Sequence, residues 1–445
     1  MSDLQPAIAP GSRRRTRVAL VNPNWDFAGS IYFGCREPHL PLEFGYAAQF
    51  LANAGYPAVL IDAQAEDLGE AALRARVSEF APDMIVVATA PSYLFWRCAP
   101  PELRIPQAAL AALQGLPAVT VAVGPHGSTT PRAVLRKLAV DAVVIGECEE
   151  VLVRLVATRK KDWGGIAGLC HWVSGEIAVQ GIPQAADMRR LPALHWAAAT
   201  LQRHTHHHHR FDAGPPVSGA EMEASRGCPY SCTFCAKENF RNRYRRRPLA
   251  RILEELDGLI AGGVGYVYFI DEIFLPWRDL LEALTARPVA FGVQSRIDLW
   301  RDDMLDLLGT AGCVSIEAGV ESLSPEGRDR LDKECRVSTD ELTRRLIYAK
   351  RSVPFVQANL IASDGDNADE VERWRAALRE DGVWANAPVP LFPYPGSPDY
   401  HRLWGLPDDC AWERALDWYL DRNAAFSDIQ ETRPRRLREL ETAHQ

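Results

Sequence analysis

Short apolar runs alternate with amphipathic stretches along the first third of the chain. Each run ends in a polar or glycine-rich loop, which is typical of a buried strand. Residues 43–54, between the first two runs, repeat their apolar positions with helical spacing, and Gly55 follows as a C-cap. Strands alternating with helices predict a doubly wound, Rossmann- or flavodoxin-like α/β sheet that binds ligands at the carboxyl ends of its strands. The predicted strands are residues 17–22, 58–62, 84–88, 118–124 and 142–145.

The same alternation resumes after residue 220 and continues to about residue 398. We count about six β/α units there, which is enough for a partial TIM-like barrel but short of the full eight. Polar residues follow the apolar runs, so the carboxyl ends of these strands should again carry the site. The predicted strands are residues 220–225, 265–270, 289–293, 314–317, 356–361 and the segment that begins at 389.

Residues 164–192 are irregular, apart from a predicted hairpin over 171–179 that turns at Ser174-Gly175. We place the domain joint there. The run His204–His209 is interpreted as a solvated linker, because no carboxylate or cysteine lies beside it in the sequence. Trp404, Trp412 and Trp418 are expected to pack within C-terminal helices, and the alternative that this segment closes a pocket stays open. The predicted divisions are a first domain over 1–160, a linker over 161–215, a partial barrel over 216–400 and a small helical region over 401–445.

Composition narrows the class of protein. The 445 residues are 47% hydrophobic and 24% charged, which predicts a sizeable core. The net charge of −8 disfavours a nucleic-acid surface. We expect no signal peptide and no membrane span, since no apolar stretch is long enough. Most of the cysteines stand alone, as expected of a soluble, cytoplasmic protein. The isolated cysteines are Cys35, Cys98, Cys148, Cys170, Cys313, Cys335 and Cys410.

Three cysteines, Cys228, Cys232 and Cys235, lie within eight residues, with Phe234 directly before the last. Three thiolates in one loop can hold three irons of a cubane cluster and leave the fourth iron open. Zinc sites usually take four protein ligands from two separated pairs, and no second pair follows. A disulfide cannot pair three cysteines evenly, and a chance cluster of core cysteines is the remaining alternative.

The Cys-x3-Cys-x2-Cys segment resembles the signature of radical S-adenosylmethionine (radical SAM) enzymes. The resemblance implies a [4Fe–4S] cluster whose open iron binds S-adenosylmethionine, with Phe234 near the adenine. In that family the end of the second strand contacts the substrate's amino group, which singles out Asp271 and Glu272. A helix N-cap is the competing interpretation of Asp271.

Other strand ends extend the resemblance. Gln294 and Arg296 follow the third strand, and Glu317 and Glu321 belong to a stretch that resembles the family's Gly-x-Glu-Ser segment near the ribose and methionine. Residues 394–398 resemble a Tyr-Pro-Gly-(Ser/Thr)-Pro segment that closes the barrel in one class of these enzymes. The basic run 241–248 is expected near the anionic cluster, or near a corrin side chain or phosphate.

The loops of the first domain resemble those of the cobalamin-binding domain that precedes the radical domain in this class. The matching stretches are Gly-x-His-x-x-Thr-x-Pro from Gly124 and Gly-Glu-x-Glu from Gly146. The resemblance implies that small residues and hydroxyls line the corrin. The Asp-x-His-x-x-Gly motif that supplies an axial histidine in many mutases is missing, and His126 is interpreted as a hydrogen-bond donor that orders its loop. The expected cobalamin contacts are Asn22, Ser92, Gly124, His126, Thr129, Gly146 and Glu147.

The resemblance as a whole implies a cobalamin-dependent radical SAM enzyme. Its expected reaction is methylation of an unactivated carbon or phosphorus of a small biosynthetic intermediate, through a 5'-deoxyadenosyl radical and methylcobalamin. An external one-electron donor of the flavodoxin or ferredoxin type is expected as partner. Three alternatives stay open: a non-methylating cyclase, rearrangement or redox enzyme, a radical SAM enzyme whose first domain binds no cobalamin, and a non-catalytic iron–sulfur or zinc protein. Aromatic candidates for a substrate pocket are Tyr32, Tyr93, Phe95, Trp96 and Tyr394.

Overall fold

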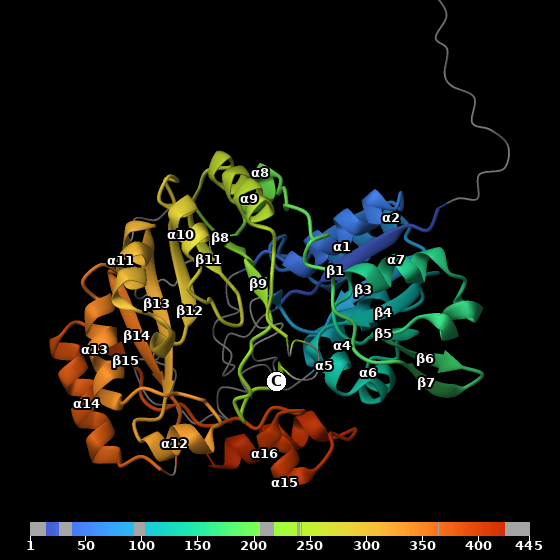
Figure 1. Cartoon of the computed structure of the whole chain (residues 1–445). Coiled ribbons are helices and arrows are strands. Elements are labelled where there is room, and N and C mark those ends of the chain that lie inside the picture. Colours follow the sequence, from blue (N-terminus) through green and yellow to red (C-terminus); the bar gives the residue numbers. More distant parts are fainter. Residues whose placement is uncertain are drawn as a thin grey trace, which may run out of the picture.

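The protein is described by a computed structural model that covers residues 15–25, 38–92, 103–204, 218–237, 241, 243–363 and 365–422. Two parallel sheets, one from each half of the sequence, face each other across the middle of the molecule, and two C-terminal helices lie below both (Figure 1). Tyr32, Tyr93, Phe95, Trp96 and the segment Thr205–His209 lie outside the described residues.

The first sheet confirms the predicted doubly wound fold. Its strand order is β2-β1-β3-β4-β5-β6-β7, in which β1 to β5 are parallel and β6 and β7 add an antiparallel hairpin. The order 2-1-3-4-5 is that of flavodoxin-like sheets. The strands are β1 (Val18–Asn22), β2 (Ala58–Asp62), β3 (Met84–Ala88), β4 (Val119–Val123), β5 (Ala142–Val144), β6 (Leu169–Val173) and β7 (Glu176–Gln180).

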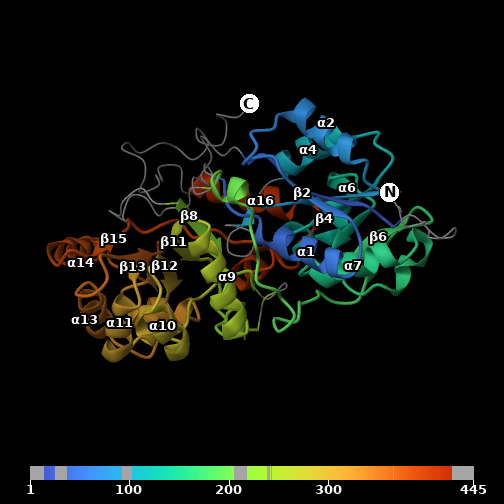
Figure 2. The ribbon, with the colours of Figure 1, turned by 90° about the horizontal axis from the view of Figure 1, so that it is seen from above.

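Helices cover both faces of this sheet because successive strand residues point to opposite faces. Leu20 of β1 packs in the core with α1 and α7, whereas Ala19 and Val21 pack in the core with α2 and α4 on the other face. Figure 2 shows these helices on either side of the strands. The helices are α1 (Leu42–Asn53), α2 (Glu70–Phe80), α4 (Arg104–Leu113), α5 (Pro125–Thr129), α6 (Pro131–Lys137), α7 (Glu149–Ala157), η2 (Lys160–Gly165) and α8 (Ala198–Leu201).

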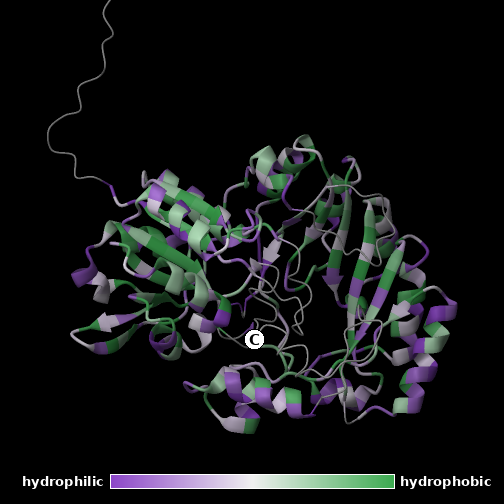
Figure 3. Ribbon diagram, turned by 180° about the vertical axis from the view of Figure 1, so that it is seen from behind, coloured by the Kyte–Doolittle hydropathy of each residue, from purple (hydrophilic) through white to green (hydrophobic). Residues whose placement is uncertain are grey.

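The second sheet is an open half-barrel of parallel strands in the order β15-β14-β13-β12-β11-β8. Its core is made by the strands and by apolar faces of the helices that follow them, and the strands are coloured mostly as hydrophobic in Figure 3. Its strands are β8 (Ser218–Met222), β11 (Val264–Phe269), β12 (Ala290–Ser295), β13 (Cys313–Glu321), β14 (Phe355–Leu360) and β15 (Trp384–Ala385).

Most helices of the second half lie on the outer side of its sheet, whereas α12, α15 and α16 lie below it, so the inner side faces the first half (Figure 1). A short antiparallel pair, β9 with β10, follows β8. The remaining elements are β9 (Ser225–Arg226), β10 (Arg245–Arg246), α9 (Leu249–Ala261), α10 (Arg278–Leu284), η4 (Ile297–Leu299), α11 (Asp302–Thr310), α12 (Pro325–Arg330), α13 (Thr339–Ala349), α14 (Ala368–Glu380), α15 (Pro398–Trp404) and α16 (Ala411–Arg422).

Two details differ from the sequence-based expectations. The hairpin at 171–179 forms as predicted, but it extends the first sheet by pairing β6 with β5, so that sheet reaches into the predicted linker. The sixth strand of the second sheet is the two-residue β15, whereas the segment from Val389 makes only an isolated bridge to Ile361. Within the described part of the chain, no helix combines the length and apolarity needed to cross a membrane.

The fold makes one glycine substitution costly. Gly146 has φ of +96°, and an added Cβ would lie 2.2 Å from the carbonyl oxygen of Gln184, which pairs with it in a bridge. We expect Gly146→Ala to lower the free energy of unfolding by about 2 kcal/mol or more. Gly164→Ala is the matched control, because its Cβ would meet nothing within 4 Å. Urea unfolding of both variants checks this, and equal stabilities would contradict it.

Candidate functional site

The three motif cysteines line one cavity of about 180 Å³ at the carboxyl ends of the strands of the second sheet. Phe234 lies in the same lining, and its position near an adenine stays a prediction. Basic and acidic side chains complete it, and two of them, Lys237 and Lys333, are residues for which the sequence offered no signal. The lining comprises Cys228, Tyr230, Cys232, Phe234, Cys235, Lys237, Glu272, Ile273, Gln294, Ser295, Arg296, Gly319, Glu321 and Lys333.

The thiols lie in a setting that suits bound metal rather than free thiolate. Burial raises the pKa of Cys232 to about 11 and that of Cys235 to about 12, and it also raises the pKa of Cys228. Backbone amides of Tyr230 and Lys237 donate toward the sulfurs of Cys228 and Cys235, and these hydrogen bonds lower the pKa of the two thiols, against the effect of burial. These thiols therefore lose their protons when a cation binds the sulfur.

The spacing of the sulfurs differs from that of a single-ion site. Among the described residues, no group of three His, Cys, Asp or Glu side chains converges so as to hold one metal ion. A cubane cluster does not require such convergence, because each thiolate binds its own iron. The donor set of three cysteines around one cavity therefore fits a cluster.

The two carboxylates after β11 have different surroundings. Asp271 is buried and accepts hydrogen bonds from the Ala224 amide and the Ser225 hydroxyl, and burial raises its pKa to about 7. Glu272 lines the cavity, accepts the Gly227 amide at 2.7 Å and pairs with Arg241 at 2.6 Å. Asp271 thus fixes the chain ahead of the cysteine loop. The predicted contact with an amino group stays a prediction, and of the two carboxylates Glu272 is the one that the cavity exposes.

The other predicted residues of this half are divided between the cavity and the strand interior. Arg296 lies 3.9 Å from the Tyr230 ring and forms a forked pair with Asp298. Glu321 has φ of +64° and accepts a bond from the buried Lys333 at 2.7 Å. Gln294 lines the cavity too, whereas Glu317, its register partner on β13, is not in the lining.

The predicted cobalamin contacts all lie at or just beyond the carboxyl ends of strands of the first sheet. Most of their polar groups bond within the protein. Asn22 donates to Asp62, Ser92 donates to Glu43, and His126 Nδ1 lies 3.1 Å from the Thr89 hydroxyl. Gly124 has φ of +133°, and Thr129 is half-buried.

His204 corrects one expectation. It was interpreted as part of a solvated linker with no carboxylate nearby, yet it is fully buried and its Nε2 lies 3.1 Å from Asp62 at the end of β2. Although burial opposes it, the hydrogen bond with Asp62 raises the pKa of His204. The partner is 142 residues away in the sequence, so no local pattern could have revealed it.

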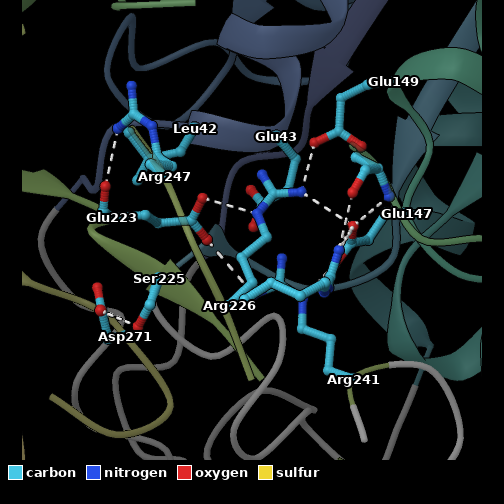
Figure 4. A network of polar contacts seen from close by, with 12 residues as sticks. Leu42, Glu43, Glu147, Glu149, Glu223, Ser225, Arg226, Arg241, Arg247 and Asp271 are labelled. Carbon is cyan, nitrogen blue, oxygen red and sulfur yellow. Dashed lines mark hydrogen bonds and ion pairs between the residues drawn. The ribbon is translucent and has the colours of Figure 1, made fainter. Parts of the chain in front are cut away.

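Glu147 is the centre of a buried ionic network that joins the two halves (Figure 4). Its carboxylate accepts two hydrogen bonds from Arg245, at 2.6 and 3.0 Å. It also lies 3.1 Å from the Arg241 guanidinium and 3.4 Å from that of Arg226. Burial alone would raise the pKa of Glu147, but these three guanidinium groups lower it to about 2. It is therefore ionised at neutral pH.

Arg226 carries the network to the cysteine loop, which begins two residues later. It donates to Glu149 at 2.7 Å and to Glu223 at 2.9 Å, and it is completely buried. The Tyr46 ring of α1 lies 5.2 Å from Arg226 and 5.3 Å from Arg247. The Gly-Glu-x-Glu stretch thus meets the arginines that flank the cluster loop.

The basic run 241–248 is bound by carboxylates of the protein itself. Arg241 pairs with Glu272 of the cysteine cavity, Arg245 pairs with Glu147, and Arg247 pairs with Glu255 at 2.7 Å. Buried carboxylates need such partners, so these positive charges are balanced within the chain. The expected position of the run near a cluster or a corrin group stays a prediction.

Comparison with protein families now defines the two halves. Residues 222–378 match the radical SAM superfamily, and residues 35–156 match the B12 binding domain. The chain is a radical SAM protein with an N-terminal B12-binding domain. These matches agree with the two sheets, and the predicted domain bounds of 1–160 and 216–400 stay predictions.

Curated relatives carry out more than one reaction. The chain is 26% identical, over 82% of its length, to an anaerobic magnesium-protoporphyrin IX monomethyl ester cyclase of Rubrivivax gelatinosus, of which it covers 66%. It is 24% identical to an uncharacterised methyltransferase of Pyrococcus horikoshii, over 87% of this chain and 82% of the relative. It is 26% identical to the hopanoid C-3 methylase of Methylococcus capsulatus, over 81% of this chain and 68% of the relative. The chain therefore spans about two thirds of the cyclase.

Solved structures share the fold. The methyltransferase TsrM of Kitasatospora setae superposes with a TM-score of 0.68 at 17% identity, over 87% of this chain and 77% of that one. The cobalamin-dependent radical enzyme OxsB superposes with a TM-score of 0.69 at 16% identity, over 89% of this chain and 63% of that one. At these identities the likeness concerns the arrangement of the two domains.

The network predicts a large effect of neutralising Glu147. Glu147→Gln leaves Arg226, Arg241 and Arg245 without their shared charge, so the free energy of unfolding should fall by about 3 kcal/mol. Glu150→Gln is the control, because its partner Arg190 is exposed and such pairs contribute about 0–1 kcal/mol. Denaturant unfolding measures both, and a similar loss in the two variants would argue against the network.

Glu43 predicts a pH dependence of stability. Burial, then the nearby Glu223, raises its pKa to about 7, so the folded state favours the protonated carboxyl. The stabilisation that Glu43 gives the folded state is complete below the pKa of this carboxyl in the unfolded chain. It is lost as pH rises through about 7, the pKa in the folded state. Between about pH 5 and about pH 8 the wild type should lose on the order of 2 kcal/mol that Glu43→Gln retains. Glu79→Gln on the exposed side of α2 serves as control. A difference that stays constant with pH would refute the assignment.

Proposed function

We propose that the protein is a cobalamin-dependent radical SAM methyltransferase that acts on an unactivated carbon or phosphorus of a small molecule. The observation that carries the proposal is the joining of the two halves at the cysteine loop. Arg226, two residues before Cys228, is bonded to the Glu149 carboxylate of the B12-binding domain. One set of buried contacts thus holds the cysteine cavity beside the domain that would carry cobalamin.

The cysteine cavity fits the cluster and its ligand. When bound, the cluster supplies the electron that cleaves S-adenosylmethionine, and cobalamin supplies the carrier of the methyl group. Glu272 offers a carboxylate oxygen to an ammonium group, and Lys237 offers positive charge to a carboxylate, whereas Glu321 and Lys333 pair with each other in the lining. Phe234 offers an aromatic face in the same cavity. These side chains orient the ligand and shield the reacting atoms from water.

The loops of the first sheet fit cobalamin through a smaller set of residues than expected. The side chains of a corrin end in amides, which need polar protein atoms and backbone that allows close approach. Gly124, whose φ of +133° suits glycine, and the half-buried Thr129 meet those needs. His126, Ser128 and Thr130 are buried and bonded within the protein, so we assign them to shaping the loop.

Methylation and cyclisation are both found among the relatives, which include methylases and anaerobic cyclases. We favour methylation because several relatives with different printed names are methylases or methyltransferases, whereas the cyclases all carry one name. An external flavodoxin- or ferredoxin-type donor would supply the electrons, and a cytoplasmic location stays a prediction from the isolated cysteines.

The test is anaerobic purification and reconstitution with iron, sulfide and hydroxocobalamin. The wild type should hold about four irons and about one cobalt per chain. Reduced and given S-adenosylmethionine, it should form 5'-deoxyadenosine and S-adenosylhomocysteine. Cys232→Ala should lose the cluster and at least 100-fold of 5'-deoxyadenosine formation, and keep cobalt. Cys410→Ser, at an exposed cysteine outside the cavity, is the control.

The outcomes separate the alternatives. Iron and 5'-deoxyadenosine without cobalt would leave a radical enzyme whose first domain binds no cobalamin. Both metals without S-adenosylhomocysteine would favour a non-methylating reaction. Zinc in place of iron, with no cleavage of S-adenosylmethionine, would overturn the proposal altogether.

A further inference from the structure

The C-terminal residues 397–422, here called the C-terminal clamp, contact both cofactor loops at once. They comprise the N-cap Ser397 and helices α15 and α16. Figure 1 shows these helices below the two halves, reaching from α12 on one side to α5 and α6 on the other. Sequence analysis predicted that the tryptophans here pack within helices or that the segment closes a pocket, and it gave no partners for them.

The first contact of the clamp is with the cysteine loop. Thr233, between Cys232 and Phe234, accepts the Asp399 amide on its carbonyl oxygen at 2.9 Å. Its hydroxyl donates to Asp399 Oδ2 at 3.0 Å. Both residues are buried, with 8% and 6% of their surfaces exposed. The amide of Thr233 is held at 2.9 Å by the Leu331 carbonyl after α12, so the loop is fixed on two sides.

The second contact is with the loop after β4. The Trp412 ring lies 4.5 Å from the His126 ring, centroid to centroid, and its Nε1 donates to the Thr130 hydroxyl at 3.1 Å. Trp412 is 5% exposed. Two exposed ion pairs, Arg136 with Asp409 and Lys137 with Glu413, lie beside it.

The clamp is stiff enough to connect these contacts. Tyr400 of α15 packs in one apolar cluster with Ala411, Ala415 and Tyr419 of α16. The Tyr400 hydroxyl also accepts a bond from Arg414 at 3.0 Å. A displacement at Trp412 is therefore passed on to Asp399, because close-packed helices move as a unit.

We infer that the C-terminal clamp sets the separation between the iron–sulfur cluster and cobalamin, with Asp399 and Trp412 as positioning residues. The inference rests on the proposed function. Glu147 with its arginines, the bond between His39 and Glu221, and the packing of α1 into the second core join the halves at the base of the cluster loop. The clamp adds a junction on the other side of that loop, because it contacts both the cluster loop and the loop after β4. Group transfer between two cofactors is sensitive to such a distance, since about 1 Å of misplacement can cost about 100-fold in rate.

The test uses the full chain, reconstituted with iron, sulfide and hydroxocobalamin and reduced until both centres are paramagnetic. The dipolar coupling between the reduced cluster and cob(II)alamin, measured by EPR, reports their distance without any substrate. We expect a narrow distance distribution in the wild type. Trp412→Ala and Asp399→Ala should each broaden it at least two-fold, with iron and cobalt contents unchanged.

Two further variants separate positioning from general stability. Trp418→Ala removes a half-buried tryptophan from the same helix, whose described ring contacts lie within the clamp, and should keep the wild-type distribution. Trp412→Phe keeps a ring against His126 and should recover most of the narrow distribution. Wild-type distributions in Asp399→Ala and in Trp412→Ala would overturn the clamp; if Trp412→Ala fails to fold, Asp399→Ala alone decides. A wild type that binds iron but no cobalt would overturn the proposed function first, and the clamp with it.

Discussion

The buried carboxylate of Glu147, bound by three arginines from the other half of the chain, is the interaction on which the arrangement of the two domains depends. Neither half can bury its own charged side chains of this network without the other half, because an unpaired ion in a dry interior costs several kcal/mol. Two of the arginines, Arg226 and Arg241, are almost fully buried, so their charges require carboxylate partners, and the buried carboxylates require the arginines in turn. The carboxylates concerned are Glu147, Glu149, Glu223 and Glu272. Such mutual dependence specifies one docking geometry, which apolar contact by itself would leave less defined.

The network matters for the site because of where its members lie in the sequence. Arg226 precedes the cysteine loop by two residues, and Glu272, which pairs with Arg241, also holds the Gly227 amide. The base of the loop is therefore fixed by the same groups that fix the domain interface, while Thr233 fixes its far side. A loop held at both ends keeps three thiols around one cavity before any metal binds, which lowers the ordering cost of binding.

The sequence was a good guide to the elements and a poor guide to their partners. Five strands of the first sheet were predicted to within a residue or so, since buried parallel strands leave an apolar run that needs no knowledge of neighbours. The short β15 left no such run and was missed. The three cysteines, Phe234 and Glu272, which the sequence analysis singled out, line one cavity, while the roles predicted for them stay predictions. The arginine partners of Glu147 lie 79 to 98 residues away, and Asp62 and Thr130, which contact His204 and Trp412, lie further still, so only the folded chain reveals them.

The network and the clamp are needed whether the enzyme methylates or cyclises its substrate, so neither decides the reaction. The choice lies with the inner face of the second sheet. Its parallel register sets Gln294, which lines the cysteine cavity, beside Glu317, and Glu317 beside Gln357. Residues level with each other on adjacent strands share a face, so two carboxamides flank a carboxylate on the face that lines the cavity. Gln357 is bonded to Asn359, and Glu317 also interacts within the protein. Of this row, Gln294 is therefore the side chain that the cavity offers to a ligand, and its carboxamide can both donate and accept a hydrogen bond.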